Sequence, residues 1–288
     1  MDIEFGLNVS ADPTLGADPV TQAIKAEQLG FDFVSASDHL HGEHPTYEPW
    51  TLLAWIASST SRLRVATRVL ATPYRNPAVL AKMAETFDRL SRGRLILGLG
   101  AGYLDEEFRA FGLRVPTAGE KVRGLEEAIA IARGLWSAEH LTFEGSLYRT
   151  LQARLEPKPD HSIPIWLGTY GPRALDVTGR MADGWIPTLQ VAPPERVAGM
   201  RRRVLAGAER ADRNPDDILC VYNLGVQVAE APLEHPGVLA GPPEWIAERL
   251  LEFTGIGFRA FNFLVEGPAS PEQVERLSRE VLPLVRTG

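Results

Sequence analysis

Three of the chain's six histidines lie within six positions of one another, in the segment SASDHLHGEHPTYEPW at residues 35–50. They are His39, His41 and His44. Such a cluster is compatible with a metal site, a proton-transfer site or a solvated loop. A glycine- and proline-containing loop gives these spacings no fixed geometry, whereas zinc ligands are usually held by rigid elements. We therefore expect no metal site here.

His39 is the histidine best placed for chemistry. It follows Asp38 directly after the apolar run FDFVSAS at residues 31–37, so it stands where a predicted strand ends. An imidazole changes charge near neutral pH, which suits a donor or acceptor of protons. We predict that His39 and Asp38 are catalytic, with Asp38 orienting His39 or contacting a coenzyme. His41 and His44 are read either as pocket residues or as a solvated loop.

Two glycine-containing segments follow other predicted strands. In LGLGAGYLDEEF, at residues 97–108, the glycines do not have the dinucleotide-binding spacing. The acidic residues 105–107 of the first helical turn would also repel a phosphate. These glycines instead favour close approach of the backbone to something flat and uncharged.

The segment GTYGPRAL, at residues 168–175, has the opposite character. Pro172 is typical of a first helical turn, and Arg173 puts a cation at the positive end of that helix. An anion docked on the backbone N–H groups of residues 169–171 would explain the arginine. We predict a phosphate site here, the alternative being that Arg173 bends out into solvent.

A third segment, RVLATPYRNP, leads into another predicted helix. Pro77 keeps Asn76 extended and then serves as a helix starter. Arg75 either clamps an acidic partner or pairs locally, and the sequence does not decide between the two.

The elements that must position these residues alternate along the chain. Short runs rich in Val, Ile and Phe are separated by segments of helical period, and most runs are almost continuously apolar, as in parallel sheets covered on both faces. Eight such units fit a (β/α)₈ barrel better than an open doubly wound sheet, and the active site of a barrel lies at the carboxyl ends of its strands. The predicted strands are 3–9, 31–37, 63–70, 94–100, 164–168, 184–188, 219–228 and 258–265.

The predicted helices carry apolar stripes that should face the core. The longest lies between the fourth and fifth strands, in a connection that also carries a hairpin around Glu144 and Gly145. We read this helix and hairpin as an insertion, and residues 1–288 as one domain, because no linker divides the chain. The stripes are Leu80, Met83, Phe87, Leu90; Val122, Leu125, Ile129, Ala132, Trp136; Ile246, Leu250, Phe253; and Val274, Leu277, Val281, Leu284.

Composition and charge exclude several classes of protein. Thirty Lys and Arg are outnumbered by 37 Asp and Glu and are scattered, so a nucleic-acid partner is not expected. There is no signal-peptide pattern at the start and no apolar run of membrane-spanning length, and we expect a cytoplasmic protein without a membrane partner. The single cysteine, Cys220, excludes an internal disulfide and is read as a buried thiol.

Four segments in order resemble the luciferase-like flavin monooxygenases and deazaflavin-dependent oxidoreductases. They are DHL, RNPAVLAKMAETFDRLSRGRLILGLGAGYLDEEF, PIWLGTYGPRALDVTGRMADGWI and GPPEWIAERLLEFTGIG, and the resemblance runs from about residue 3 to 285. It implies a (β/α)₈ barrel that holds FMN or the 5-deazaflavin coenzyme F420 at its mouth, and a homodimer. Both coenzymes have a tricyclic ring and a phosphate.

The resemblance also implies roles for particular residues. The residues matching Asp38 and His39 lie by the ring, and the histidine handles a proton during hydride transfer. A non-prolyl cis peptide that buttresses the ring falls on Arg68 and Val69. Backbone at Ala101 and Gly102 flanks the coenzyme, and the segment Gly168, Thr169, Tyr170, Gly171 takes its phosphate together with Arg173.

The chain departs from the sugar-phosphate dehydrogenases of this group. They have an acidic residue where Tyr103 stands and a tryptophan soon after the Asp-His pair, so their substrate and full acid/base set do not transfer. We expect an F420-dependent oxidoreductase that moves a hydride between the deazaflavin C5 and a small organic substrate. The alternatives are an FMN-dependent monooxygenase that uses O₂ and a non-catalytic flavin-binding barrel. Expected pocket residues are Asn8, His41, His44, Tyr47 and Tyr103.

Overall fold

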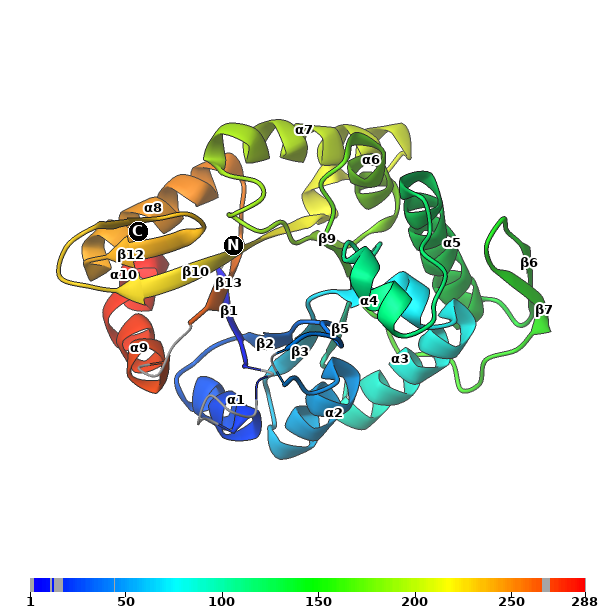
Figure 1. Ribbon diagram of the computed structural model, residues 1–288, viewed down its shortest axis with the longest axis horizontal. Helices are drawn as coiled ribbons and strands as arrows, with labels where there is room; N and C mark the ends of the chain where they lie inside the picture. The colour runs from blue at the N-terminus through cyan, green and yellow to red at the C-terminus, as the bar shows by residue number, and fades with distance from the viewer. Residues whose placement is uncertain (1–2, 11, 13–17, 44, 266–269, 288) are drawn as a thin grey trace.

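The computed structural model is a closed barrel of eight parallel strands surrounded by helices (Figure 1). It describes residues 3–10, 12, 18–43, 45–265 and 270–287. The barrel closes because the seventh strand pairs in parallel with both the sixth and the eighth. The predicted (β/α)₈ barrel is therefore confirmed. The barrel strands are β1 (Glu4–Asn8), β2 (Phe33–Ala36), β3 (Arg64–Thr67), β5 (Leu95–Gly100), β8 (Ile165–Leu167), β9 (Gly184–Trp185), β10 (Leu219–Val228) and β13 (Ala260–Leu264).

Several helices begin where the sequence provides proline and a capping side chain. A helix starts at Pro77, as predicted. Asn76 caps it, and Glu48 caps the helix before it. Thr117 and Glu120 form a capping box at the start of the longest helix. The helices are α1 (Pro19–Gln28), α2 (Pro49–Ser59), α3 (Pro77–Ser91), α4 (Asp105–Ala110), α5 (Ala118–Ser137), α6 (Pro172–Met181), α7 (Pro194–Arg210), α8 (Pro243–Ile256), α9 (Ser270–Arg276) and α10 (Leu282–Thr287).

The connection from β5 to β8 contains α4, α5 and the antiparallel pair β6 (Leu141–Glu144) and β7 (Arg149–Ala153). The helix α5 contacts α3 and α6, so it occupies a place in the outer ring of helices. The hairpin extends beyond that ring (Figure 1).

Two features of the fold differ from expectation. The predicted strand 63–70 is divided into β3 and the short β4 (Leu70–Ala71). A second hairpin, β11 (Leu233–His235) and β12 (Val238–Gly241), was not predicted, and it adds to β10 at one side of the barrel. No helix in the described ranges is long and apolar enough to cross a membrane.

Two residues of the predicted stripes do not face the core. Leu90 is 80% exposed because it lies on the outer side of α3, while Leu80 and Phe87 are buried. Leu284 is 39% exposed, and Leu282 and Val285 are buried in its place. A π-helical turn at Leu277–Val281 precedes it and shifts the buried face along the chain.

The barrel interior has an apolar layer and a polar layer above it. The apolar layer is centred on Phe33 and Trp166, whose rings pack edge to face with their centroids 5.3 Å apart. Strand residues two positions further on point to the same side, so the next layer toward the carboxyl ends contains Asn8, Ser35, Arg68, Asn223 and Asn262. This polar layer forms the floor of the barrel mouth.

Candidate active site

Asp38 joins the segments that follow β2 and β3. Its buried carboxylate accepts a hydrogen bond from the backbone N–H of Ala71 at 2.8 Å. It also accepts two from Arg75, at 2.8 and 3.1 Å. Arg75 donates further to Glu48 at 2.7 Å. Arg75 therefore clamps two acidic partners, which decides the question that the sequence left open.

His39 is bound to a different residue from the one expected. Its Nδ1 lies 3.2 Å from Oε1 of Glu107, and its ring meets that of Tyr103 edge-on at 5.7 Å. The prediction that Asp38 orients His39 is not supported, because the oxygens of Asp38 are directed to Arg75 and Ala71. The two neighbours in sequence are anchored to different loops.

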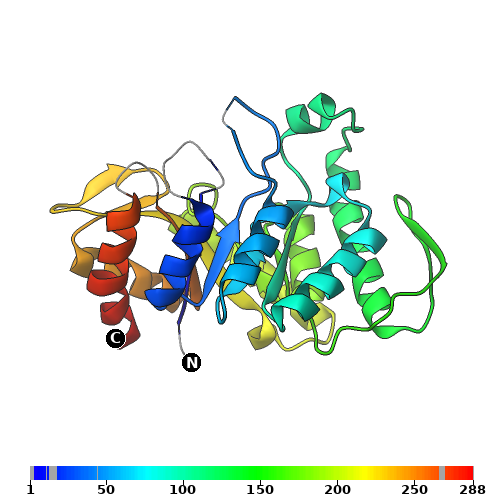
Figure 2. The same cartoon turned by 90° about the horizontal axis from the view of Figure 1, so that it is seen from below.

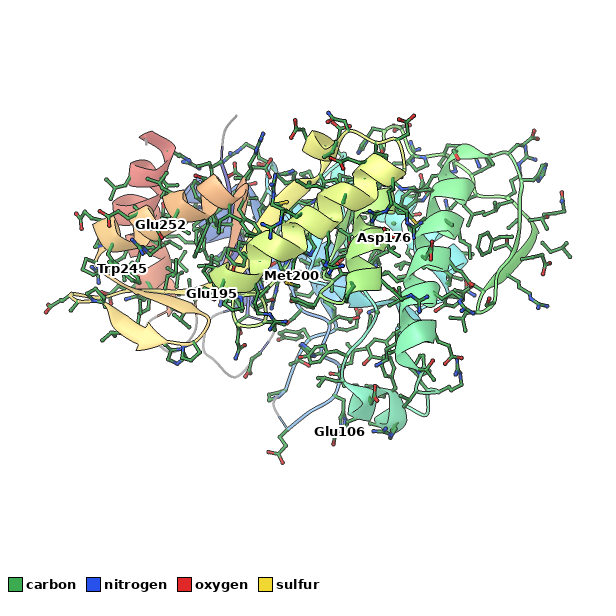
Figure 3. The ribbon with its side chains drawn as sticks, turned by 90° about the horizontal axis from the view of Figure 1, so that it is seen from above. Glu106, Asp176, Glu195, Met200, Trp245 and Glu252 are labelled. Carbon is green, nitrogen blue, oxygen red and sulfur yellow. The ribbon has the colours of Figure 1, made fainter. Side chains whose placement is uncertain are left out.

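Glu107 is the inward-facing member of the three acidic residues that start α4. Glu107 is 5% exposed, whereas Glu106 is exposed and lies at the outer edge of the molecule (Figure 3). The hydroxyl of Tyr74 donates to Oε2 of Glu107 at 2.7 Å. Burial, this hydrogen bond and the charge of Glu107 raise the pKa of Tyr74, so its phenol stays protonated and available as a donor.

The segments after β2 and β5 rise side by side from one end of the barrel (Figure 2). Two contacts join these segments. His39 lies beside Glu107, and the rings of His41 and Phe111 pack edge to face with their centroids 6.0 Å apart. They form one wall of the mouth.

Val69 projects toward the ends of β5 and β8. The Arg68–Val69 peptide bond is cis, as the resemblance implied. A Cβ at Gly100 would lie 2.6 Å from Cγ2 of Val69, and one at Gly168 would lie 3.0 Å from it. A Cβ at Gly98 would overlap the carbonyl oxygen of Thr67. These glycines therefore make room for Val69 and the β3 backbone, which explains their presence without an external flat group.

Ala101 and Gly102 continue from β5 at the same end of the barrel and are half-buried. Gly102 has a φ of +73°, a conformation that favours glycine, and a Cβ there would lie 2.5 Å from Cζ of Phe108. The turn at Gly102 brings the chain from β5 into α4. Its place beside a coenzyme stays a prediction.

The polar layer is a chain of hydrogen bonds across the barrel. Oδ1 of Asn8 accepts from Nε of Arg68 at 2.9 Å and from the hydroxyl of Ser35 at 3.3 Å. Ser35 also donates to Asn262 at 2.9 Å, and Asn262 donates to Asn223 at 2.7 Å. The floor of the mouth is thus held by partners from β1, β2, β10 and β13 and from the residue that follows β3.

The start of α6 is the candidate phosphate site. Gly171, its N-cap, makes no side-chain capping bond, and residues 171–173 are exposed. Nη1 of Arg173 lies 3.8 Å from the position of a Cβ at Gly119, so the guanidinium reaches the start of α5. The preceding Thr169 is buried and bonded to Thr178 at 2.6 Å, and it fixes the turn.

Tyr170 points back toward the barrel. Its hydroxyl accepts a hydrogen bond from the backbone N–H of Thr188 at 3.1 Å, and the Thr188 hydroxyl accepts one from Asn223 at 3.0 Å. The segment after β8 is therefore tied to the polar floor.

The expected pocket residues divide into two sets. Asn8 lies in the polar floor and Tyr103 contacts His39. His41 and Tyr47 are exposed on the segment after β2, and His44 lies outside the described residues.

Burial, followed by the charge of Glu107, raises the pKa of Tyr103, so this phenol is protonated at neutral pH.

Several residues of the site were missed by the sequence reasoning. Tyr74 and Glu107 carried no distinguishing pattern, and the amides of Asn223 and Asn262 lie inside apolar strands. A polar residue within such a strand is the signal that could have found the amides, because a buried polar group needs a partner. Within the described residues, no group of three or more His, Cys, Asp or Glu side chains could hold a metal ion.

Comparisons with known proteins agree with this architecture. Residues 9–234 match the family model described as luciferase-like monooxygenase. The F420-dependent glucose-6-phosphate dehydrogenase of Beutenbergia cavernae is 31% identical over 293 residues, covering 99% of this chain and 82% of that protein. The enzyme of the same name from Microbacterium testaceum is 27% identical, covering 99% of this chain and 98% of that protein.

A solved structure of an F420-dependent secondary alcohol dehydrogenase, in complex with an F420–acetone adduct, superimposes with a TM-score of 0.89. It is 21% identical and the match covers 99% of this chain and 100% of that one, which supports the barrel fold. With the family model spanning most of the barrel, the chain belongs to the luciferase-like monooxygenase family.

Proposed function

We propose that this protein is an F420-dependent oxidoreductase that transfers a hydride between C5 of the deazaflavin and a small organic substrate. The observation that carries the proposal is the convergence of four segments at the barrel mouth. Asp38, Arg75 and Ala71 join the segments after β2 and β3, His39 and Glu107 join those after β2 and β5, and Val69 packs against Gly168. The names of the relatives support the choice of coenzyme.

The donor set at the mouth fits a coenzyme with a flat ring and an anionic tail. The start of α6 offers backbone N–H groups without a side-chain cap, next to the Arg173 cation, and this combination suits a phosphate. Val69 and the adjoining glycines give an uncharged surface at the ends of β5 and β8. Arg68, Val69, Ala101 and Gly102 would hold the ring, and residues 168–171 with Arg173 would hold the phosphate. Asp38 would act on the ring site through Arg75 and the Ala71 backbone, because its side chain is fully buried.

The bound deazaflavin would supply the hydride chemistry. The protein would contribute mainly by positioning, which is worth up to roughly 7–11 kcal/mol when two reactants are held in contact. His39 would take a proton from a substrate hydroxyl or return one to a carbonyl oxygen, for a gain of about 10²–10⁴-fold. Asn8, Tyr103, His41 and Tyr47 are the proposed substrate contacts, with His44 on the same segment.

A titration with both coenzymes tests this proposal. The purified protein is titrated with F420 and, separately, with FMN while absorbance and fluorescence are followed. We expect saturable, micromolar or tighter binding of F420 and weaker binding of FMN. Tight binding of FMN with none of F420 would contradict the proposal and favour the monooxygenase alternative.

We also propose that the protein is a homodimer joined through α2 and α3. Val79 and Leu90 are 58% and 80% exposed on α3, and together with Met83 and Phe87 they line a groove between these two neighbouring helices. Trp55 on α2 is 68% exposed. Large exposed apolar patches mark association sites. Leu90→Glu should convert the dimer to a monomer in sedimentation velocity, whereas the control Leu151→Glu on the β6–β7 hairpin should leave the dimer intact. A monomeric wild-type protein would refute the proposed dimer.

The expected cytoplasmic location stays a prediction.

A further inference from the structure

The carboxylate of Glu107 lies between two side chains that come from different segments. One oxygen faces Nδ1 of His39 at 3.2 Å, and the other accepts from the Tyr74 hydroxyl at 2.7 Å. The side chain of Glu107 is 6% exposed and that of His39 is 41% exposed. The arrangement runs from the partly buried phenol, through the buried acid, to an imidazole at the barrel mouth.

Glu107 is set apart from the two acids beside it. Asp105 pairs with Lys121 at 2.7 Å, and Glu106 is exposed on the outer side of α4 (Figure 3). Burying a carboxylate is costly unless it is hydrogen-bonded, so a purely structural acid at this surface helix would be expected to face solvent as Glu106 does. The cost of burying Glu107 is offset only if its partners Tyr74 and His39 hold it there.

The chemistry of the pair fixes the state of the imidazole. An ionised carboxylate only accepts hydrogen bonds, so Nδ1 must carry the hydrogen in the contact with Glu107. In the neutral ring the remaining nitrogen, Nε2, then has its lone pair available as an acceptor. The same device fixes histidine tautomers in many enzymes, where the supporting group is needed for activity.

We propose that Glu107 is a positioning residue that holds His39 as its Nδ1–H tautomer with Nε2 available to the substrate, and that Tyr74 holds Glu107 in place. This inference rests on the proposed function. In the oxidative direction the bound deazaflavin would be the oxidant and would accept the hydride from the substrate carbon. The hydroxyl proton passes to Nε2 of His39, and the C–O bond becomes a carbonyl. In reduction, the Nε2 proton returns to the carbonyl oxygen.

Other charged and ring groups near His39 do not supply this role. Tyr103 meets the imidazole through its ring edge, and its phenol is protonated. Asp38 is committed to Arg75 and the backbone of Ala71. Arg75 is shared between Asp38 and Glu48. Glu107 is thus the carboxylate that the structure directs at Nδ1.

The test is the tautomer of His39 in the coenzyme-free protein, measured by NMR from the nitrogen signals of its imidazole ring. Imidazole ¹⁵N shifts are recorded for protein labelled with ¹⁵N at its histidines, at a pH at which the rings are neutral. His39→Gln identifies the His39 signals among those of the six histidines. We expect wild-type His39 to be protonated at Nδ1 and bare at Nε2. A wild-type Nε2–H tautomer would overturn the proposal, whatever the variants do.

Glu107→Leu removes the acceptor and should release His39 to a mixture of tautomers. Its matched control is Glu106→Leu, one position away on the same helix, which should keep the wild-type signals. Tyr74→Phe leaves the carboxylate and should weaken the preference partially, and it serves as the second variant if Glu107→Leu does not fold. An unchanged tautomer in both Glu107→Leu and Tyr74→Phe would refute the positioning role.

Turnover and coenzyme binding separate this inference from the proposed function. Glu107→Leu should lower kcat by about 10–100-fold while the Kd for F420 stays within about threefold, because the loss acts through His39 rather than on the coenzyme. The tautomer measurement needs no coenzyme, so its result does not depend on whether the protein binds F420. Failure of wild-type protein to bind F420 would refute the proposed function alone.

Discussion

Arg75 donates to both carboxylate oxygens of Asp38, and this ion pair ties the segment after β3 to the end of β2. The Asp38 side chain has no exposed surface and that of Arg75 is 14% exposed. The pair is therefore shielded from solvent, unlike most ion pairs at a protein surface. Because His39 follows Asp38 directly in the chain, the ion pair also fixes the position of the His39 backbone.

Arg75→Met should destabilise the protein strongly. It leaves the Asp38 carboxylate buried without its charge partner, and breaking a buried pair in this way typically costs about 3–5 kcal/mol. Urea denaturation followed by circular dichroism measures the change. Arg114→Met is the control, because its pair with Glu120 lies at the surface, is screened by solvent and should contribute little to stability. Equal losses in the two variants would contradict the structural role of Arg75.

His39→Ala should separate catalysis from binding. We expect coenzyme affinity to stay within about tenfold and turnover to fall by roughly 10² or more, since a proton donor or acceptor is lost while the mouth remains. Steady-state kinetics and the coenzyme titration give both quantities. His140→Ala, an exposed histidine beside the β6–β7 hairpin, is the control. Unchanged turnover in His39→Ala would remove this residue from the mechanism.

Arg173→Ala should weaken binding of the complete coenzyme about 10–100-fold, because one charge-assisted hydrogen bond to the phosphate is lost. Binding of the dephosphorylated deazaflavin core should be unaffected. Both are measured by the same fluorescence titration, with Arg202→Ala on the exposed face of α7 as a control. Equal losses for coenzyme and core would mean that the phosphate lies elsewhere.

Glu48 should contribute an acid-sensitive part of the stability. Burial opposes ionisation of Glu48, but hydrogen bonds from Thr51, Arg75 and Trp50 outweigh it, and the pKa is lowered from its ordinary value of 4.5. A lowered folded-state pKa stabilises the protein above the unfolded value, and this contribution is lost as the pH falls through the folded value.

Glu48→Gln should therefore lose stability near neutral pH and lose less than wild type when the solution is acidified below pH 4.5. Urea midpoints at several pH values measure both effects. Glu106→Gln, at an exposed site, should follow the wild-type curve. Parallel curves for Glu48→Gln and wild type would show that Glu48 is not a source of the acid sensitivity.

The sequence was most informative where one periodicity decided the outcome. Apolar strands alternating with helices predicted the barrel, and the barrel rule placed Asp38, His39 and the start of α6 at one end. These predictions succeed because strand direction and side-chain alternation follow from backbone geometry.

Tertiary contacts decided the rest. Asp105, Glu106 and Glu107 are alike in sequence, and only the packing of α4 against the segment of Tyr74 turns Glu107 inward. The last stripe was wrong at Leu284 because one π-helical turn moves the buried face to Leu282 and Val285. Asn223 and Asn262 were unremarked in apolar strands because their partners come from other strands.

A crystal structure of the protein with bound F420 tests the central claim most directly. We predict that the ring contacts the segments after β2, β3 and β5, near His39 and Val69, and that its phosphate lies at the start of α6 beside Arg173. A ring bound away from these segments, or a phosphate remote from α6, would contradict the account.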